Sequence, residues 1–444
     1  MKNDSSHAVK PKQQLGLADA ISIIVGIVIG AGIFRTPSLV AANTENTITF
    51  LLTWILGGAV SIIGALCYAE LTTTFPNTGG DYHFIMRAYG KRSAFLFAWA
   101  RMSIIQTGSI ALLAFIFGDY FTRIFSLGDY SSVIYAALVV ILLTSINIAG
   151  ISFGVGTQKL FTLAEIGGAM MIVVAGLFFA PAQMEKTTEL SGSTGSQDSF
   201  IGMAMVFVLL TFGGWNEAAY ISAELKPGRK RMVKALILSL IIITAVYLLI
   251  NLAYIKALGH SGMAKSEAVG VDLMKLAWGP TGVGLIGIVV AISALTSANA
   301  TIFTGARTNY ALGRDFKVFS ALGKWNNQVS GPVNAFVIQG ILSLALISLG
   351  LITRSGFETI VEYTAPVFWF FFLLVGIALF VLRKKEPDTH RPFRVPFYPV
   401  TPIIFCLSSA YLLFSSLMYV RTGALVGIAV LFVGVLVLII SQKE

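Results

Sequence analysis

The sequence predicts an all-α polytopic membrane protein of about twelve transmembrane helices. Hydrophobic residues make up 56% of the 444 residues and charged residues only 12%. The mean hydropathy is +0.81. Apolar runs of roughly 18 to 25 residues, the length that crosses a bilayer as a helix, recur along the chain between charges, glycines and prolines. A soluble globule could not bury this much apolar side chain, so the bilayer must be its solvent.

The elements follow in order from these runs. A polar tail, residues 1–14, leads into a first span too long for the apolar core of a signal peptide. The expected spans are 17–43, 48–74, 93–121, 131–150, 159–181, 199–223, 234–256, 279–312, 333–353, 357–382, 399–420 and 423–441. No linker separates them, so we expect one domain, 1–444. It divides into five spans (15–181), five spans (199–382) and two final spans (399–441).

The positive charges predict the orientation. If the N-terminus is cytoplasmic, twenty Lys and Arg residues of the tails and connections fall on that side. Seven fall on the other: Arg123, Lys186, Lys256, Lys265, Lys275, Arg354 and Arg421. Cytoplasmic loops hold the excess of Lys and Arg. We therefore expect a multi-pass protein of the cell membrane, inner or plasma, with both termini cytoplasmic.

Composition also excludes several classes of function. The net charge of +10 follows from this topology and requires no nucleic-acid partner. Cys67 and Cys406 both fall in predicted spans, which rules out a disulfide framework. The four histidines lie in tails or connections, and no metalloprotease or P-loop pattern is present. A membrane metalloenzyme or a nucleotide-driven pump is not expected, and no cofactor is implied.

Two glycine-rich interruptions cut long apolar spans near their middle, at 30–34 (GAGIF) and 212–217 (FGGWNE). In hydrocarbon, an unpaired backbone group costs several kcal/mol, so irregular backbone is tolerated only beside a cavity or within protein. Breaks at corresponding positions of two halves point to a transporter's substrate site. The alternative interpretation of glycines in a span is close packing between helices.

Further motifs carry a family resemblance. They are FPNTGGDY at 75–82, GARTNYALGRD at 305–315 and Asn299, together with the two breaks. With these, the chain resembles the amino acid, polyamine and organocation transporter superfamily, and within it the bacterial L-type amino acid transporters. The resemblance covers most of the chain. It implies a leucine-transporter-like inverted repeat of five plus five helices, with helices 1 and 6 discontinuous, plus two C-terminal helices.

The resemblance implies a substrate site at the two breaks. Backbone N–H groups of Ala31, Gly32 and Ile33 would hold a carboxylate, which the positive end of a half-helix also favours. Carbonyls around Ile27, Phe212 and Gly213 would accept from the ammonium. The implied substrate-binding residues are Ile27, Gly30, Ala31, Gly32, Ile33, Phe212, Gly213, Gly214, Trp215 and Asn216.

Residues around the second break should set selectivity and gating. Relatives that carry arginine often have an acidic residue where this chain has Asn216, so the amide predicts a neutral substrate, although Glu217 follows directly. L-type members usually place an aromatic gate where this chain has Leu210. Phe212 and Trp215 are the alternative gating residues, and Trp215 is equally consistent with ordinary packing.

A carboxylate in the fifth expected span, 159–181, departs from the family pattern. Sodium-independent relatives carry a lysine where this chain has Glu165. Lys159, six residues earlier, lies about 240° around the helix and should reach toward the membrane surface. A carboxylate within a span is by default functional. Glu165 could carry a proton, help to coordinate a hard cation, or pair permanently with a neighbouring Arg or hydroxyl.

Hydroxyls in the eighth expected span, 279–312, suggest a cation site. Thr296 and Ser297 stand where sodium-dependent proteins of the leucine-transporter fold offer two oxygens, and the matching carbonyls are those of Gly26 and Ile29. The candidate sodium ligands are therefore Gly26, Ile29, Thr296 and Ser297, with Glu165 as a further ion-coupling residue. Alternatively, both hydroxyls bond back to their own helix.

Together, these features predict a secondary active transporter of small, neutral L-amino acids that works by alternating access with proton or sodium coupling. It is not expected to be an enzyme. The alternatives are a sodium-independent exchanger, an amino-acid-binding membrane sensor or a channel. The resemblance also raises a disulfide-linked heavy subunit, but residues 123–132 contain no cysteine, so none is expected. A monomer or a homodimer is expected.

Overall fold

A computed structural model describes residues 13–181, 201–226, 230–349, 356–420 and 424–441. The predicted tail, apart from its last two residues, lies outside them. The described chain is helical throughout, with two isolated β-bridges and no strand. Nine of its helices are long and apolar enough to cross a membrane, and three shorter apolar helices add Leu17–Val28, Val333–Ser348 and Leu425–Ile439. The prediction of an all-α polytopic membrane protein is confirmed.

The helices follow the predicted spans. In the first half they are α1 (Leu17–Val28), η1 (Ala31–Phe34), α2 (Thr36–Ala42), α3 (Thr47–Thr74), α4 (Asp81–Tyr89), α5 (Lys91–Ala100), η2 (Arg101–Ile105), α6 (Gln106–Ile124), α7 (Ser131–Ala149), α8 (Ile151–Val174) and η3 (Ala175–Phe179). In the second they are α9 (Ile201–Thr211), η4 (Trp215–Ile221), α10 (Lys230–Lys265), α11 (Val269–Asp315), η5 (Lys317–Phe319), α12 (Val333–Leu349), α13 (Gly356–Lys385), α14 (Val400–Val420) and α15 (Ala424–Ser441).

The structure differs most from the predicted boundaries at four places. The helix expected at 234–256 runs from Lys230 to Lys265 as α10, across a bend at Gly259. The helix expected at 159–181 begins at Ile151, directly after Gly150, whose φ of +138° ends α7. A short amphipathic helix, α4, occupies a connection that had no predicted element. The helix expected at 279–312 begins at Val269 and bends at Trp278 and Gly279. A glycine with positive φ precedes α4 and α8 and marks the bends in α10 and α11, whereas α11 itself begins after Ala268.

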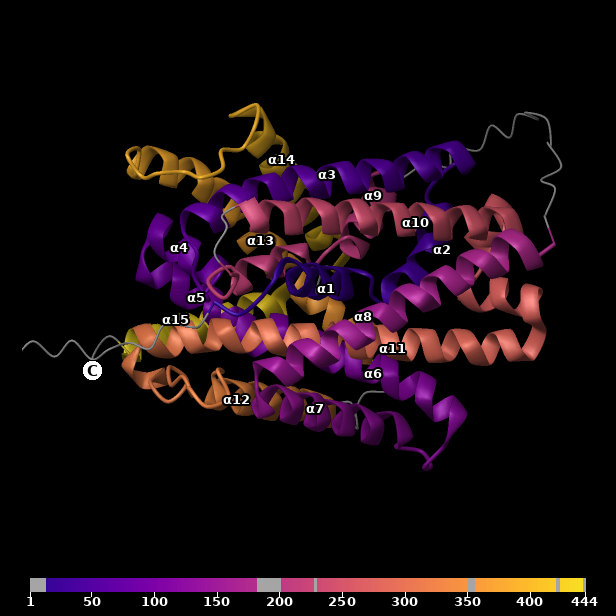
Figure 1. Cartoon of the computed structure of the whole chain (residues 1–444), viewed down its shortest axis with the longest axis horizontal. Helices are drawn as coiled ribbons and strands as arrows, with labels where there is room; N and C mark the ends of the chain where they lie inside the picture. The colour runs from indigo at the N-terminus through magenta and orange to yellow at the C-terminus, as the bar shows by residue number, and fades with distance from the viewer. Residues whose placement is uncertain (1–12, 182–200, 227–229, 350–355, 421–423, 442–444) are drawn as a thin grey trace, which may run out of the picture.

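The broken first helix lies at the centre of the bundle. α1 contacts α8, α10 and α11, and Figure 1 shows α10 and α11 running along opposite sides of it. α6, α7 and α12 pack together beyond α11, and α13 packs on α14 and α15. The division into repeats at 15–181 and 199–382 stays a prediction. What matters for function is that α1 and the α9–η4 segment both lie within protein.

Candidate functional site

The first break separates α1 from α2. α1 ends at Val28, residues 31–34 form the single 3₁₀ turn η1, and α2 begins at Thr36. The N–H groups of Ala31 and Gly32 make no backbone hydrogen bond in the described structure. Ile33 donates to the Gly30 carbonyl across a long 3.4 Å. Gly32 is exposed and Ala31 is half-buried.

The second break separates α9 from η4. α9 ends at Thr211, and a turn through Phe212 and Gly213 reaches Gly214, whose φ of +107° is the left-handed conformation that glycine adopts without strain. Among the described residues, the carbonyls of Phe212 and Gly213 accept no hydrogen bond. The two breaks therefore expose opposite groups, donors on the first and acceptors on the second.

Tyr247 of α10 joins the two breaks. Its hydroxyl lies 2.6 Å from the carbonyl oxygen of Val28 and 3.0 Å from that of Thr211. A hydroxyl has one hydrogen to donate, so it bonds the last turn of either α1 or α9. The side chain of Ile27 packs directly on Gly214, since a Cβ there would lie 2.4 Å from Ile27 Cγ2. The breaks are thus in contact, as the prediction of one shared site requires.

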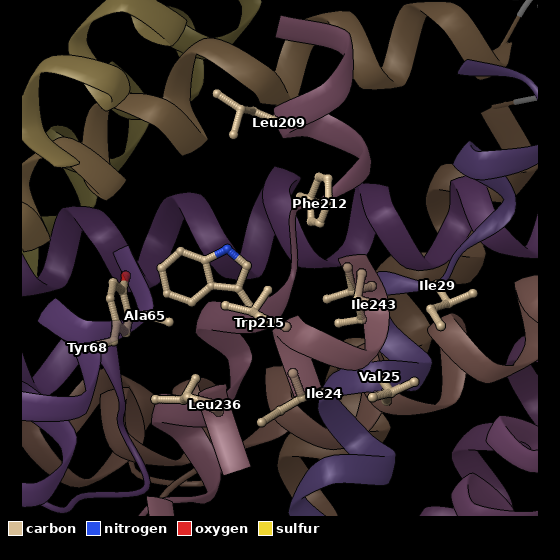
Figure 2. Packing of buried hydrophobic residues seen from close by; sticks show 14 of the residues in the cluster. Ile24, Val25, Ile29, Ala65, Tyr68, Leu209, Phe212, Trp215, Leu236 and Ile243 are labelled. Carbon is tan, nitrogen blue, oxygen red and sulfur yellow. The ribbon is translucent and has the colours of Figure 1, made fainter. Parts of the chain in front are cut away.

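A small cavity of about 30 Å³ borders the second break only. That volume holds about one water molecule. Figure 2 shows Phe212 and Trp215 at the break, with the Trp215 indole facing Tyr68. The cavity is lined by α3, α13 and α14 and by the predicted residues Gly213, Gly214, Trp215 and Asn216. Trp215 therefore lies where a gate or a side-chain pocket could form, although it also packs closely.

The other predicted gating residues lie differently. Leu210 is 39% exposed and does not line the cavity. Its neighbour Leu209 lines the cavity instead. Phe212 is fully buried and packs against Trp54 and Tyr247. The gating role of these residues stays a prediction.

Glu165 in α8 is fully buried and faces α11. Its Oε1 lies 2.5 Å from the hydroxyl of Ser293, and the same hydroxyl lies 3.0 Å from the carbonyl oxygen of Ile29. The other carboxyl oxygen, Oε2, has no hydrogen-bond partner among the described residues. Among the described residues no Lys or Arg pairs with Glu165. The carboxyl is therefore linked through one serine to the end of α1.

Of the predicted sodium ligands, the structure brings two together, Gly26 and Ser297. The Ser297 hydroxyl lies 3.1 Å from the Gly26 carbonyl and 3.3 Å from that of Ile27. The Ile29 carbonyl is reached by Ser293 instead. The Thr296 hydroxyl donates to the carbonyl oxygen of Ile292 in its own helix. This is the alternative that the sequence raised for both hydroxyls.

Sequence reasoning did not identify Tyr247 or Ser293. Ser293 stands four residues before Ser297, one turn away on the same helix face, and this spacing could have identified it. Tyr247 gave no comparable signal because tyrosine in a span usually packs. Lys159 lies in an ion pair with Asp19, directed away from Glu165 as expected.

The sequence assigns no role to four further charged residues in or beside the predicted spans, Arg35, Glu70, Arg101 and Glu362. Arg101 pairs with Glu217 at 2.6 Å, and both side chains are buried. Glu70 forms an ion pair with Arg383, whose Nη2 lies 2.5 Å from Glu70 Oε2. Arg35 lies between η1 and α2. The side chain of Glu362, in α13, lies outside the described residues.

Comparisons with known proteins fit this geometry. The amino acid permease family profile matches residues 15–440. The chain is 30% identical over 425 residues to b(0,+)-type amino acid transporter 1 of Rattus norvegicus, covering 92% of this chain and 84% of that protein. It is 31% identical over 412 residues to the Homo sapiens protein of that name (90% and 82%). It is 29% identical over 438 residues to Large neutral amino acids transporter small subunit 2 of Mus musculus (96% and 80%).

Proposed function

Because the chain belongs to the amino acid permease family, we propose that this amino acid transporter carries small, neutral L-amino acids across the cell membrane by alternating access. The observation that carries the proposal is the pair of touching helix breaks. One offers free N–H donors and the other free carbonyl acceptors. A zwitterion needs both within a few ångströms of each other.

The chemistry of binding follows from this arrangement. The carboxylate would accept from Ala31 and Gly32, at the N-terminal end of the η1–α2 segment, where the helix dipole favours an anion. The ammonium would donate to the carbonyls of Phe212 and Gly213. Since Ile27 now packs on Gly214, α1 and η4 must separate slightly to admit the substrate. That separation is the first movement of the transport cycle.

Two features support a neutral side chain. Asn216, buried and lining the cavity, carries an amide nitrogen without a partner and no charge. Glu217 is held by Arg101, so its charge is already balanced within the protein. The cavity behind the break is small, which supports a small side chain. The name of the mouse relative, which refers to neutral amino acids, agrees with this choice.

Ion coupling is proposed at Glu165. Ser293 has one hydrogen and two acceptors within reach, Ile29 O and Glu165 Oε1. Both contacts are hydrogen bonds only if Glu165 is protonated and donates to Ser293, which then donates to Ile29. A sodium ion that binds the same oxygens would replace that proton. Among the described residues no Lys or Arg pairs with Glu165, which favours either form of coupling over a permanent ion pair. The alternative of a permanent hydroxyl partner is represented by Ser293.

Uptake by proteoliposomes tests the coupling. Wild type should accumulate amino acid under an imposed proton or sodium gradient, and Glu165→Gln should transport without dependence on that gradient. Glu267→Gln, at an exposed connection, is the matched control and should behave as wild type. If Glu165→Gln keeps the full ion dependence, the residue has no part in coupling, and gradient-independent exchange by the wild type would favour the sodium-independent exchanger.

For assembly, we propose a monomer or homodimer without a disulfide-linked subunit. Cys67 is buried in α3 and Cys406 is half-buried in α14. Residues 123–132 hold no cysteine. The mouse relative is named as a small subunit. Both termini are proposed to be cytoplasmic, on the charge distribution alone.

A further inference from the structure

Five ionisable side chains form a buried cluster at one end of the bundle, close to the second helix break. Asp81 is the first residue of α4, Tyr68 lies in α3, Arg101 begins η2, and Glu217 and Tyr220 lie in η4. All are buried, and Asp81 is only 4% exposed. Neither the substrate site nor the Glu165 site uses Asp81, Tyr68 or Tyr220.

The charges in this cluster do not balance. Arg101 pairs with Glu217 and its guanidinium lies 4.0 Å above the Tyr220 ring. Asp81 is then a second carboxyl beside a single cation. Among the described residues, Asp81 Oδ1 and Arg101 Nε make no hydrogen bond of normal geometry, and the Tyr68 and Tyr220 hydroxyls are the donors that face the Asp81 carboxyl. A buried carboxylate held only by neutral hydroxyls and half of one cation is costly, and protonation removes that cost.

The cluster lies between α4 and η4, and η4 is the element that the proposed cycle separates from α1. Gly80, with φ +50°, brings α4 against Tyr220, since a Cβ there would lie 2.5 Å from its ring. Ser222, just past η4, exchanges hydrogen bonds with the backbone of Asn77 before α4. The Tyr68 ring packs edge-on against Trp215, 5.1 Å away. Movement of η4 would therefore change what surrounds the Asp81 carboxyl. The π-helical turn η2 marks the same place, as such turns often do at functional sites.

We propose that Asp81 is a proton-binding site, occupied while η4 is packed on α4 and emptied when the two separate. It is distinct from Glu165 and rests on the proposed transport function. The groups that face it are Tyr68 from α3, Arg101 from η2, and Glu217 and Tyr220 from η4. Proton release at this end of the bundle would favour the open state of the α4–η4 contact, and proton binding the closed state.

The electrostatics agree with this assignment. The pKa of the Asp81 carboxyl is raised to about 7, chiefly by burial; Arg101 opposes the rise, Glu217 adds to it, and the Tyr68 and Tyr220 hydroxyls also oppose it. An acid whose pKa is raised on folding stabilises the protein fully below its unfolded value, 3.8, and this contribution is lost as pH rises toward 7. A change of protonation near neutral pH is therefore built into the packed state.

Thermal stability of the purified full chain as a function of pH tests the site directly. Wild type should lose stability as pH rises from about 4 to about 7, and Asp81→Asn should lack this inflection. Arg101→Gln removes the cation and should move the inflection to higher pH by about 1 unit or more. Glu217→Gln leaves Arg101 free for Asp81 and should move it lower.

The decisive result is that Arg101→Gln and Glu217→Gln shift the pH of the stability inflection in opposite directions. This result can be measured even if Asp81→Asn fails to fold, and a purely structural role for the cluster would not produce it. Shifts in the same direction, no shift in either variant, or an inflection retained in Asp81→Asn would overturn the proposal.

Uptake separates this proposal from the transport function. If wild type transports amino acids with a pH dependence near 7 that Asp81→Asn lacks and Glu165→Gln retains, the two carboxyls have separate roles. If no amino acid is transported, the proposed function fails, while the stability titration still measures Asp81. If Glu165→Gln alone removes the pH dependence, Asp81 is not a site of the cycle.

Discussion

Two glycines near each other play different roles. A Cβ on Gly32 would lie 3.5 Å from Thr211 Cγ2, an ordinary contact, whereas a Cβ on Gly214 would lie 2.4 Å from Ile27 Cγ2 at a φ of +107°. Gly32 therefore keeps the first break open to a ligand, and Gly214 lets the two breaks touch.

This contrast gives a prediction for two variants. Gly32→Leu should retain the thermal stability of wild type but lose amino acid uptake, because its side chain fills the space beside the free N–H groups. Gly214→Ala should lower the melting temperature, because alanine is strained at positive φ and meets Ile27. Uptake and melting curves of both variants measure this. Wild-type uptake by Gly32→Leu would remove the first break from the binding site.

The sequence was sufficient to identify Glu165, because a carboxylate in an apolar span is conspicuous. It was not sufficient to identify its neighbour Ser293, because serine is common in membrane helices and bonds to its own turn. For the same reason Thr296 was named as a ligand although its hydroxyl bonds back to Ile292. Which hydroxyl turns outward depends on how α11 rotates against α1, and that is set by packing.

The two broken elements are held together by a third. α10 places Tyr247 between the last turns of α1 and α9, so the broken ends do not rely on packing alone. This arrangement couples both breaks to one helix, and movement of α10 would change both at once.

Tyr247→Phe removes the hydroxyl and keeps the ring. We expect a loss of about 1 kcal/mol of stability, the usual worth of one hydrogen bond, and weaker substrate binding because the α1 and α9 ends lose their common donor. Substrate-dependent thermal stabilisation measures both effects. Tyr411→Phe, in half-exposed surface of α14, is the matched control. Equal stabilisation of Tyr247→Phe and wild type by substrate would show that Tyr247 does not align the breaks.

Element positions were largely predictable from the sequence. Glycine runs inside apolar spans identified both breaks, because only backbone that lines a cavity or protein can be irregular there. The start of α8 and the short helix α4 were not predicted. Both are decided by Gly150 and Gly90, which take positive φ in connections where hydropathy carries no signal.

In the whole molecule, one end of the bundle is closed by contacts between distant segments. Leu15, before α1, pairs with Leu225, after η4, in a β-bridge. Next to it, Glu224 accepts two hydrogen bonds from Arg307 of α11, at 2.5 and 2.8 Å, with both side chains 1% exposed. Gly32, within the first break, is exposed. The structure is thus closed at the Leu15 end.

Breaking that closure should be costly. Arg307→Gln leaves Glu224 buried without its partner and should lower the free energy of unfolding by about 3–5 kcal/mol. Arg87→Gln, which breaks the more exposed pair with Glu386, should cost about 1 kcal/mol or less. Denaturation of both variants in detergent measures the difference. Similar losses would mean that the Glu224–Arg307 pair does not hold the closed end.

Counterflow in proteoliposomes tests the transport mechanism most directly. Liposomes loaded with unlabelled neutral amino acid should take up labelled amino acid faster than empty ones. Analogues that lack the carboxylate or the ammonium should not enter the liposomes and, when loaded inside, should not accelerate uptake of the labelled amino acid, because one of the two breaks would lose its ligand. Uptake that is unaffected by internal amino acid, or that accepts the amine and the acid as readily as the zwitterion, would contradict binding by the two unwound segments.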